Sequence, residues 1–361
     1  MKAAFFTGIR QLEIREVSEP ELNRDDAVLL RTDRVGVCGS DVHYYVDGRI
    51  GNQLVEYPAT LGHEFSGTIV EVGPQVKNLS PGDRVAVDPA IVCGHCDQCR
   101  AGRLNTCRNL LFMGCPGEAP GAVADYHVLP AMNCERVPDS MSLDEAALVE
   151  PLSIGLHAVR LAKPKPGDRI AVLGAGPIGL SVLLCIKATN EATVYMTDLF
   201  DNRLEVARRC GADWTANVGQ PPSTGGKLPD VFLDGATAAL TKEVPQGLDL
   251  VFECSGDPAC IDQAQELLAP GGTLVLVGIP RDERVGVDVH RMRRMEFTFK
   301  NVRRQNECVG PVLRLIEKKL IDPSPMLTHR FALSGIVEAF DLVADYSDGV
   351  IKAVVDVSGE A

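Results

Sequence analysis

The most informative stretch of the chain is Ile170-Ala171-Val172-Leu173-Gly174-Ala175-Gly176-Pro177-Ile178-Gly179. Its apolar start predicts a β-strand, and the apolar residues 180–188 that follow predict a helix. Between them lies a G-x-G-x-x-G pattern, which forms the tight turn of a dinucleotide-binding βαβ unit. Glycines let backbone N–H groups approach a pyrophosphate, and the helix N-terminus attracts its charge. We therefore expect a dinucleotide at Gly174, Gly176, Pro177, Ile178 and Gly179.

An acidic residue after the next strand indicates which dinucleotide binds. Residues 192–196 are predicted to form that strand, and Asp198 follows Gly179 by nineteen residues. At this spacing an acidic side chain accepts hydrogen bonds from the ribose hydroxyls of NAD and repels the 2′-phosphate of NADP. NAD is therefore favoured. Arg203, five residues further on, works against this selectivity and joins the predicted cofactor-binding residues.

The alternation of strand and helix that begins at the glycine turn continues along the chain. It predicts an α/β domain with a doubly wound parallel sheet. Residues 248–254 and 272–278 are continuous apolar runs suited to strands buried on both faces. Residues 219–247, which are rich in turn-forming residues, are interpreted as a surface excursion from this sheet.

The regions before and after this domain have a different character. Before residue 150, short β-like runs alternate with Gly and Pro, which predicts an irregular β domain with strands near 27–35, 67–72 and 83–87. After residue 290, an amphipathic stretch at 312–320 and a strand-like stretch at 351–357 complete neither pattern alone. We expect this tail to fold back onto the first domain. A length of 361 residues is sufficient for two such domains.

Composition and charge exclude several classes of protein. The formal net charge is −13, which would repel nucleic acids and acidic membranes, so neither is an expected partner. The start of the chain lacks the long apolar run of a signal peptide, and no run of about 18 apolar residues predicts a membrane span. The twelve cysteines are then interpreted as reduced thiols or metal ligands of a cytoplasmic protein.

Four of these cysteines form the array C-x2-C-x2-C-x7-C, namely Cys93, Cys96, Cys99 and Cys107. Four thiolates in one loop can close a tetrahedral shell around Zn²⁺. An iron–sulfur cluster is less well matched, because its fourth cysteine usually follows after three residues and precedes proline. With every position filled by protein, this zinc would order the loop and would not activate a substrate.

A second group of possible ligands occurs near the start of the chain. Cys38 begins the segment Cys38-Gly39-Ser40-Asp41-Val42-His43-Tyr44-Tyr45, and His63 and Glu64 follow Gly62. A thiolate, an imidazole and a carboxylate could converge on one zinc ion. We expect Asp41 to orient His63, because metal-bound imidazoles usually donate their second N–H to an acceptor. The other cysteines, Cys115 among them, are expected to be inert.

Together with the glycine turn, these motifs resemble the zinc-dependent medium-chain dehydrogenase/reductase family over almost the whole chain. The segment at Cys38–Tyr45 and the sequence Glu150-Pro151-Leu152-Ser153 are similar to its polyol dehydrogenases, which act on sorbitol, xylitol or L-arabinitol. The resemblance implies a GroES-like, mostly β catalytic domain (1–155), a Rossmann domain (156–292) and a return segment (293–361) that completes the catalytic domain.

The resemblance also implies roles for single residues. Cys38, His63 and either Glu64 or Glu150 would hold the catalytic zinc, and the sequence leaves open which glutamate binds it directly. Ser40 and His43 would carry the proton of the substrate hydroxyl away, with water held by Glu150 as another route.

The resemblance further implies NAD-dependent oxidation of a secondary hydroxyl of a polyol to the ketose by a homotetramer. Tyr44, Phe112 and Arg303 fall where polyol enzymes contact the carbon chain. Arg304 departs from the usual Arg-Tyr pair. An extra guanidinium favours a longer or more anionic substrate, such as a sugar acid or sugar phosphate, or else it simply faces water. A threonine 3-dehydrogenase-like or general secondary-alcohol dehydrogenase is the alternative activity. The subunits would assemble at the Rossmann sheet edge, around residues 272–278.

Overall fold

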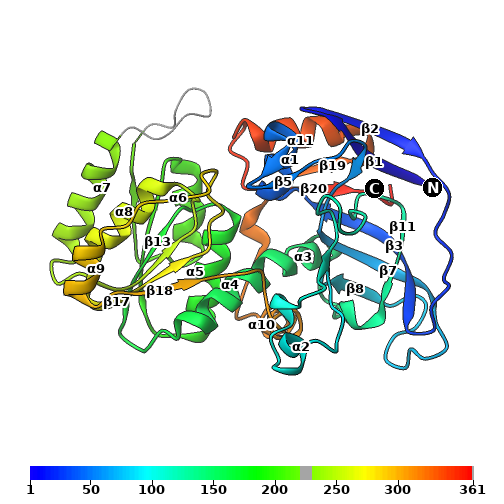
Figure 1. Ribbon diagram of the computed structural model, residues 1–361, viewed down its shortest axis with the longest axis horizontal. Helices are drawn as coiled ribbons and strands as arrows, with labels where there is room; N and C mark the ends of the chain where they lie inside the picture. The colour runs from blue at the N-terminus through cyan, green and yellow to red at the C-terminus, as the bar shows by residue number, and fades with distance from the viewer. Residues whose placement is uncertain (220–229, 360–361) are drawn as a thin grey trace. The chain divides into compact units, whose positions relative to one another are not determined.

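The computed structural model describes residues 1–219 and 230–359, which form two compact units (Figure 1). Unit 1 comprises Met1–Glu150, Asn306–Lys319 and the residues from Leu327 onward. Unit 2 comprises Pro151–Gln305 and Leu320–Met326. The domain limits expected from the sequence, at 155/156 and 292/293, stay a prediction.

Unit 1 is built on a seven-stranded sheet with the order β12-β8-β7-β3-β20-β19, in which β11 also pairs with β3. Its central strands are buried over most of their length, as strands covered on both faces are. The predicted strands near 27–35, 67–72 and 83–87 correspond to β3, β7 and β8. The strands are β3 (Ala27–Gly36), β7 (Glu64–Val72), β8 (Arg84–Val87), β11 (Tyr126–Pro130), β12 (Cys134–Arg136), β19 (Leu327–Ala332) and β20 (Lys352–Asp356).

The end of the chain is part of this sheet. Strand β20 pairs antiparallel with β3 and parallel with β19, so residues more than 300 positions apart lie side by side. Earlier in the same C-terminal segment, the amphipathic stretch near 312–320 forms helix α10 (Val309–Glu317). Its buried residues include Val312 and Ile316.

Smaller strands and helices surround the sheet of unit 1. An aromatic cluster of Phe6, Tyr45 and Phe340 joins strand β1 to helices α1 and α11 in the core. The small strands are β1 (Lys2–Gly8), β2 (Gln11–Glu16), β4 (Arg49–Ile50), β5 (Gln53–Leu54), β6 (Ala59–Thr60), β9 (Ala90–Ile91) and β10 (Leu111–Phe112). The helices are α1 (Gly39–Asp47), α2 (Asp97–Arg100), α3 (Leu143–Ala147) and α11 (Ile336–Ala344).

Unit 2 is a six-stranded parallel sheet with the order β15-β14-β13-β16-β17-β18. The strand order reverses at β13, the strand that precedes the glycine turn. The strands are β13 (Arg169–Leu173), β14 (Thr193–Asp198), β15 (Trp214–Asn217), β16 (Leu248–Glu253), β17 (Leu268–Leu276) and β18 (Thr298–Asn301). The predicted α/β fold class is confirmed.

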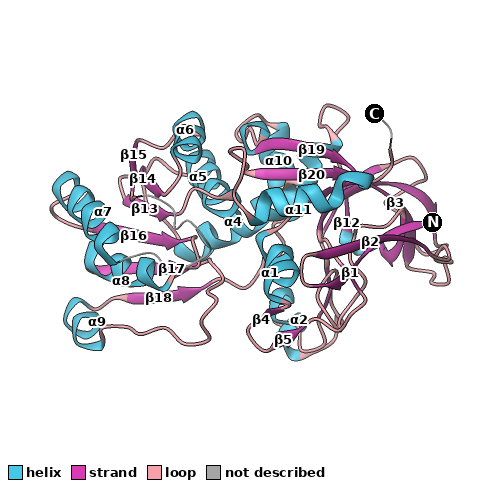
Figure 2. Ribbon diagram, turned by 90° about the horizontal axis from the view of Figure 1, so that it is seen from above, coloured by secondary structure: helices cyan, strands magenta, loops and turns pink. Residues whose placement is uncertain are grey.

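Right-handed connections place the helices of unit 2 on both faces of this sheet, because the strand order runs in opposite directions on either side of β13. Helices α5 and α6 connect strands on one side, and in Figure 2 they are seen apart from α7 and α8. The helices are α4 (Val149–Ala162), α5 (Pro177–Thr189), α6 (Asp201–Arg209), α7 (Asp230–Glu243), α8 (Pro258–Leu267) and α9 (Val289–Met295).

Two sequence-based expectations are wrong here. Residues 219–247 are more than a surface excursion, because Asp230–Glu243 form helix α7; residues 220–229 lie outside the described part of the chain. Residues 272–278 cannot be the sheet edge, because β17 pairs with β16 and β18 on its two sides. The edges are β15 and β18. Among the described residues, no helix is both long and apolar enough to cross a membrane.

Candidate functional site

The glycine turn joins β13 to α5 in unit 2. Gly174 has a φ of +100°, a left-handed conformation that favours glycine. A Cβ atom on Gly179 would collide with the carbonyl oxygen of Gly174, so only glycine allows this approach of helix to turn. Gly176 precedes the helix, and Pro177 occupies its first turn. The backbone N–H groups at the start of α5 can therefore meet an anionic group such as a pyrophosphate.

Asp198 ends β14 and reaches back to this turn. Its Oδ2 accepts a hydrogen bond from the N–H of Ala175 at 2.6 Å, and its Oδ1 accepts one from the N–H of Phe200 at 2.9 Å. A carboxylate has about four lone-pair sites, so two remain for ribose hydroxyls. Arg203 Nη1 lies 3.9 Å from Asp198 Oδ2, and a Cβ on Gly176 would lie 3.6 Å from Nη1. The predicted cofactor residues thus lie together in unit 2.

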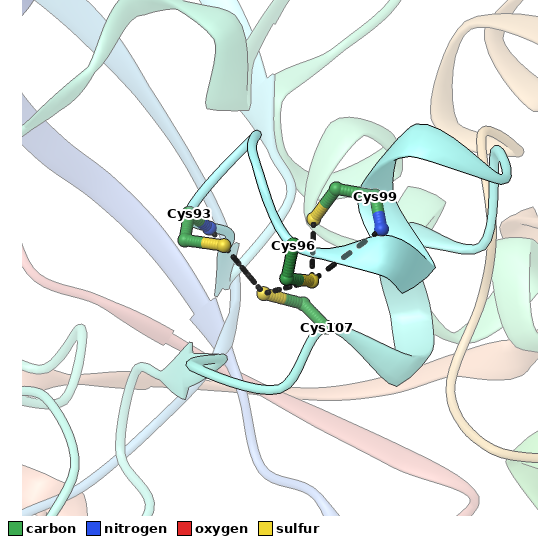
Figure 3. Close-up of side chains that lie close together, drawn as sticks. All are labelled: Cys93, Cys96, Cys99 and Cys107. Carbon is green, nitrogen blue, oxygen red and sulfur yellow. Dashed lines mark hydrogen bonds between the residues drawn. The ribbon is translucent and has the colours of Figure 1, made fainter.

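The four cysteines of the C-x2-C-x2-C-x7-C array converge in unit 1 (Figure 3). Their Sγ–Sγ distances are 3.6 Å for Cys96–Cys99, 4.0 Å for Cys96–Cys107 and 3.5 Å for Cys93–Cys107. A tetrahedral shell with Zn–S bonds of about 2.3 Å separates its sulfurs by about 3.8 Å. All four are free thiols. The donor set and its spacing fit a zinc ion.

The second predicted ligand group also forms a cluster. The Sγ of Cys38, a ring nitrogen of His63 and a carboxylate oxygen of Glu64 all lie within 4.8 Å of one another. Cys38 is the residue before helix α1, and Glu64 begins strand β7 directly after His63. Glu64 pairs with Gly36 at the end of β3, so Cys38, two residues further along the chain, lies close to His63 and Glu64.

The surroundings of the Asp41 carboxylate indicate whether this cluster can bind a metal ion. Its carboxylate is buried, and within the described chain neither of its oxygens has a hydrogen-bond partner of good geometry. His63 Nδ1 lies 3.3 Å from Asp41 Oδ1. An imidazole that donates Nδ1–H to this carboxylate keeps Nε2 free to bind a metal. The arrangement therefore fits a cation bound by His63.

Lys352 is a buried residue of the cluster that the sequence analysis missed. Its Nζ donates to Oε1 and Oε2 of Glu64 at 2.8 and 2.6 Å, and to the carbonyl of Val37 at 3.0 Å. Both side chains are 1% exposed. A lysine inside the apolar stretch 350–355 was the available signal, since lysine is rarely buried without a partner.

Glu150 is buried at the start of α4, close enough to be influenced by the charges of the cluster. Burial raises the pKa of its carboxyl, and the charges of Glu64 and Asp88 raise it further, whereas His63 and Lys352 lower it. Cys38, Asp41, Glu64 and Glu150 can all become negative, whereas Lys352 and a protonated His63 are the positive charges beside them. A divalent cation would neutralise most of this excess.

The remaining predicted residues are placed as follows. Ser40 Oγ donates to Cys38 Sγ at 3.3 Å, and His43 Nδ1 lies 3.5 Å from Asp47 Oδ2. The Phe112 ring lies beside that of His63, with their centroids 5.1 Å apart. Arg303 is an exposed residue of unit 2, and its predicted substrate contact stays a prediction.

Comparisons with known proteins agree with this geometry. Residues 24–139 match the model of the alcohol dehydrogenase GroES-like domain, and residues 177–318 match that of the zinc-binding dehydrogenase. Sorbitol dehydrogenase of Bacillus subtilis (strain 168) is 33% identical over 355 residues, which cover 98% of this chain and 97% of the relative. The chain belongs to the zinc-dependent medium-chain dehydrogenase/reductase family.

Two further relatives bear on substrate and cofactor. L-idonate 5-dehydrogenase of Vitis vinifera is 36% identical over 344 residues, covering 95% of this chain and 91% of the relative. A solved structure from Sinorhizobium meliloti 1021, described as a zinc-binding dehydrogenase bound to NADP, has a TM-score of 0.85 at 28% identity, with 98% of each chain covered. The predicted family and its polyol branch are confirmed. This member of the family is a zinc- and nicotinamide-dependent oxidoreductase that acts on CH–OH groups.

Proposed function

We propose that the chain oxidises a secondary hydroxyl of a polyol of the xylitol, sorbitol or L-arabinitol type to the ketose, reversibly and with NAD. The convergence of Cys38, His63 and Glu64 within 4.8 Å carries this proposal, because three protein ligands leave the fourth position of a tetrahedral zinc ion to a substrate oxygen. Oxidation of a sugar acid is the second candidate. The L-idonate 5-dehydrogenase relative and the additional Arg304 favour it.

Two zinc ions per chain are proposed. Cys38, His63 and Glu64 would hold the catalytic ion, and Cys93, Cys96, Cys99 and Cys107 would hold the structural one. We take Glu64 as the direct ligand and Glu150 as the alternative, which is supported by the place of Glu64 in the group within 4.8 Å. When bound, zinc supplies Lewis acidity toward a hydroxyl group, and the nicotinamide accepts hydride.

The residues of the chain would orient the substrate and move its proton. Asp41 fixes the ring of His63. Ser40, on the first turn of α1, would hydrogen-bond the substrate hydroxyl and release its own proton as it receives that of the substrate, and His43 on the next turn would be the final proton acceptor, as histidine side chains commonly are. The buried carboxyl of Glu150 would hold a water molecule for the second route.

NAD is the proposed cofactor because the negative charge of Asp198 lies at the glycine turn. Arg203 beside it would contact the same nucleotide. A homotetramer in the cytoplasm is also part of the proposal and rests on the resemblance alone; the mass of the chain in solution tests the assembly.

Turnover by the zinc-loaded chain tests the proposal. We expect NADH to form from xylitol, sorbitol or L-arabinitol, and a chelator to abolish its formation. Cys38→Ser is expected to lower kcat/KM at least about 100-fold and to remove one of the two zinc ions, because serine is a much weaker zinc ligand than a thiolate. Replacing Glu64 is a less specific test, since it would also leave Lys352 without its partner.

Cys210→Ser is the matched control. Cys210 is a buried thiol in unit 2 and belongs to neither cysteine cluster. It should keep both zinc ions and the wild-type rate. Full activity of the zinc-free chain, or of Cys38→Ser, would show that the cluster is not the catalytic centre.

A further inference from the structure

A partly buried polar network surrounds the Tyr44 hydroxyl and is not part of the proton path or the metal sites. It joins Tyr44 on α1, Gln53 on β5, and Cys115 and Glu118 in the loop after β10. The inference below rests on the proposed function, in which Tyr44 contacts the substrate. It concerns which substrates Tyr44 accepts.

The hydroxyl of Tyr44 acts as a donor inside this network. It donates to Oε1 of Gln53 at 2.7 Å. Burial raises the pKa of Tyr44 well above its ordinary value, and the neighbouring Cys115, Asp41 and Glu118 raise it further. The phenol therefore keeps its proton and donates a hydrogen bond to Gln53.

The orientation of the Gln53 amide is fixed by groups that can only accept. Its Nε2 lies 3.3 Å from Oε1 of Glu118 and 3.5 Å from the carbonyl oxygen of Pro116. Nε2 also donates to Cys115 Sγ at 2.8 Å. A flipped amide would place its oxygen against a carboxylate and a carbonyl, so Oε1 must face Tyr44.

Cys115 and Glu118 complete the network and connect it to the candidate metal site. Burial raises the pKa of Cys115, so its thiol keeps a proton and donates it to Glu118 Oε1 at 3.3 Å, closer than the 3.8 Å to Tyr44. Glu118 Oε2 accepts the N–H of Phe112 at 2.7 Å. The same carboxylate thus fixes the residue that packs beside His63.

We propose that Gln53, Cys115 and Glu118 determine substrate specificity by making the Tyr44 hydroxyl an obligate hydrogen-bond acceptor beside a negative charge. Because the Tyr44 hydroxyl already donates its hydrogen bond to Gln53, its oxygen can only accept one from a hydroxyl group of the substrate. A carboxylate or a phosphate has no proton to give at neutral pH and would also be repelled by Glu118. The site then selects uncharged polyols over sugar acids and sugar phosphates.

The test compares kcat/KM for xylitol with that for xylonate, a carboxylate of the same length, in the zinc-loaded chain with saturating NAD⁺. Glu118→Gln removes the charge with little change in shape, and Gln53→Met removes the acceptor of the Tyr44 proton. We expect either variant to reduce the ratio of xylitol to xylonate at least tenfold. Tyr44→Phe should reduce kcat/KM for xylitol and change that for xylonate little.

Glu56→Gln is the matched control, because Glu56 is exposed and lies outside the network. It should keep the wild-type ratio, and thermal melting identifies a variant that has not folded. An unchanged ratio in folded Glu118→Gln and Gln53→Met, or a wild-type preference for xylonate, overturns the inference. If neither compound is turned over, the proposed function fails. In that case the inference is still tested by calorimetry, which compares the binding of xylitol and of xylonate to the wild type and to the variants.

Discussion

The buried Lys352 ammonium illustrates what one residue contributes to the candidate metal site. It holds both carboxylate oxygens of Glu64 and is itself held by the carbonyl of Val37. Removing one partner of a buried ion pair leaves an uncompensated charge, which costs about 3–5 kcal/mol. Each carboxylate oxygen keeps a second lone pair, and one oxygen of Glu64 lies within 4.8 Å of the ligand atoms of Cys38 and His63. Lys352 is therefore a positioning residue for the proposed ligand.

Asp198 carries a prediction at the same scale. Asp198→Asn removes the charge that repels a 2′-phosphate, so we expect the ratio of kcat/KM for NAD to that for NADP to fall at least about tenfold, which corresponds to about 1.4 kcal/mol. The amide replaces one acceptor oxygen by a donor, so either Ala175 or Phe200 loses its partner. The free energy of unfolding should fall by about 1–3 kcal/mol. Steady-state kinetics with both cofactors and urea denaturation measure the two effects.

Asp139→Asn provides the comparison for this variant. Asp139 is an exposed carboxylate of unit 1, and its replacement should change neither the cofactor ratio nor the stability. A wild-type chain that prefers NADP, or an unchanged ratio in Asp198→Asn, would contradict the proposed role of Asp198.

At the scale of the element, the sequence predicts a strand or helix well where local pattern and burial agree. The apolar run before Gly174 predicts β13, since a strand buried on both faces needs such a run. Helix α7 was missed because turn residues at 220–226 dominated the interpretation of the region, although residues 238–241 are Ala-Ala-Leu-Thr, which a helix accommodates. Helix α7 contacts helix α8, and the local sequence of α7 does not encode this tertiary contact.

The four-cysteine loop gives a prediction for an element that has little core of its own. Its only regular structure is the four-residue helix α2 and a single 3-10 turn, and among its cysteines only Cys107 is buried. Cys96→Ser together with Cys99→Ser should therefore release one zinc ion per chain and leave the loop open to proteolysis. We expect the Tm to fall by roughly 5 °C or more, because metal binding supplies the folding energy of such loops.

Zinc analysis, limited proteolysis and thermal melting measure these effects. Cys260→Ser, a buried thiol of unit 2, is the control that should keep the zinc content and the protease resistance. A double variant that retains the wild-type zinc content would rule out a zinc ion in this loop.

At the scale of the whole molecule, the sequence identifies clusters of ligand types but not the pairs that long-range folding creates. The motifs at Cys38 and at His63-Glu64 predict a metal site because their residue types are those that zinc prefers. The partner of Glu64 is 288 positions away and becomes its neighbour only because β20 pairs with β3. Gln53 and Glu118 are 65 positions apart and also meet only in the folded chain. Such pairs depend on the register of strands, which no local spacing encodes.

The stability of the whole chain should also depend on pH through His127. The ring is buried in unit 1, its Nε2 lies 3.1 Å from the carbonyl oxygen of Ala122, and burial lowers its pKa to about 4. In the unfolded chain the pKa returns to about 6.5, so below that pH the unfolded state binds a proton that the native state lacks. Folding is therefore destabilised as the pH falls from about 6.5 to 4, and it is unaffected by this residue above 6.5.

His127→Gln isolates this contribution, because the amide can still donate to Ala122 and does not titrate. Between pH 7 and pH 5 we expect the free energy of unfolding of the wild-type chain to fall by about 2 kcal/mol more than that of the variant. Urea denaturation at the two pH values measures the difference, in which the contributions of all other groups cancel. Equal losses in both proteins would mean that the His127 ring is protonated or solvent-accessible in the native state.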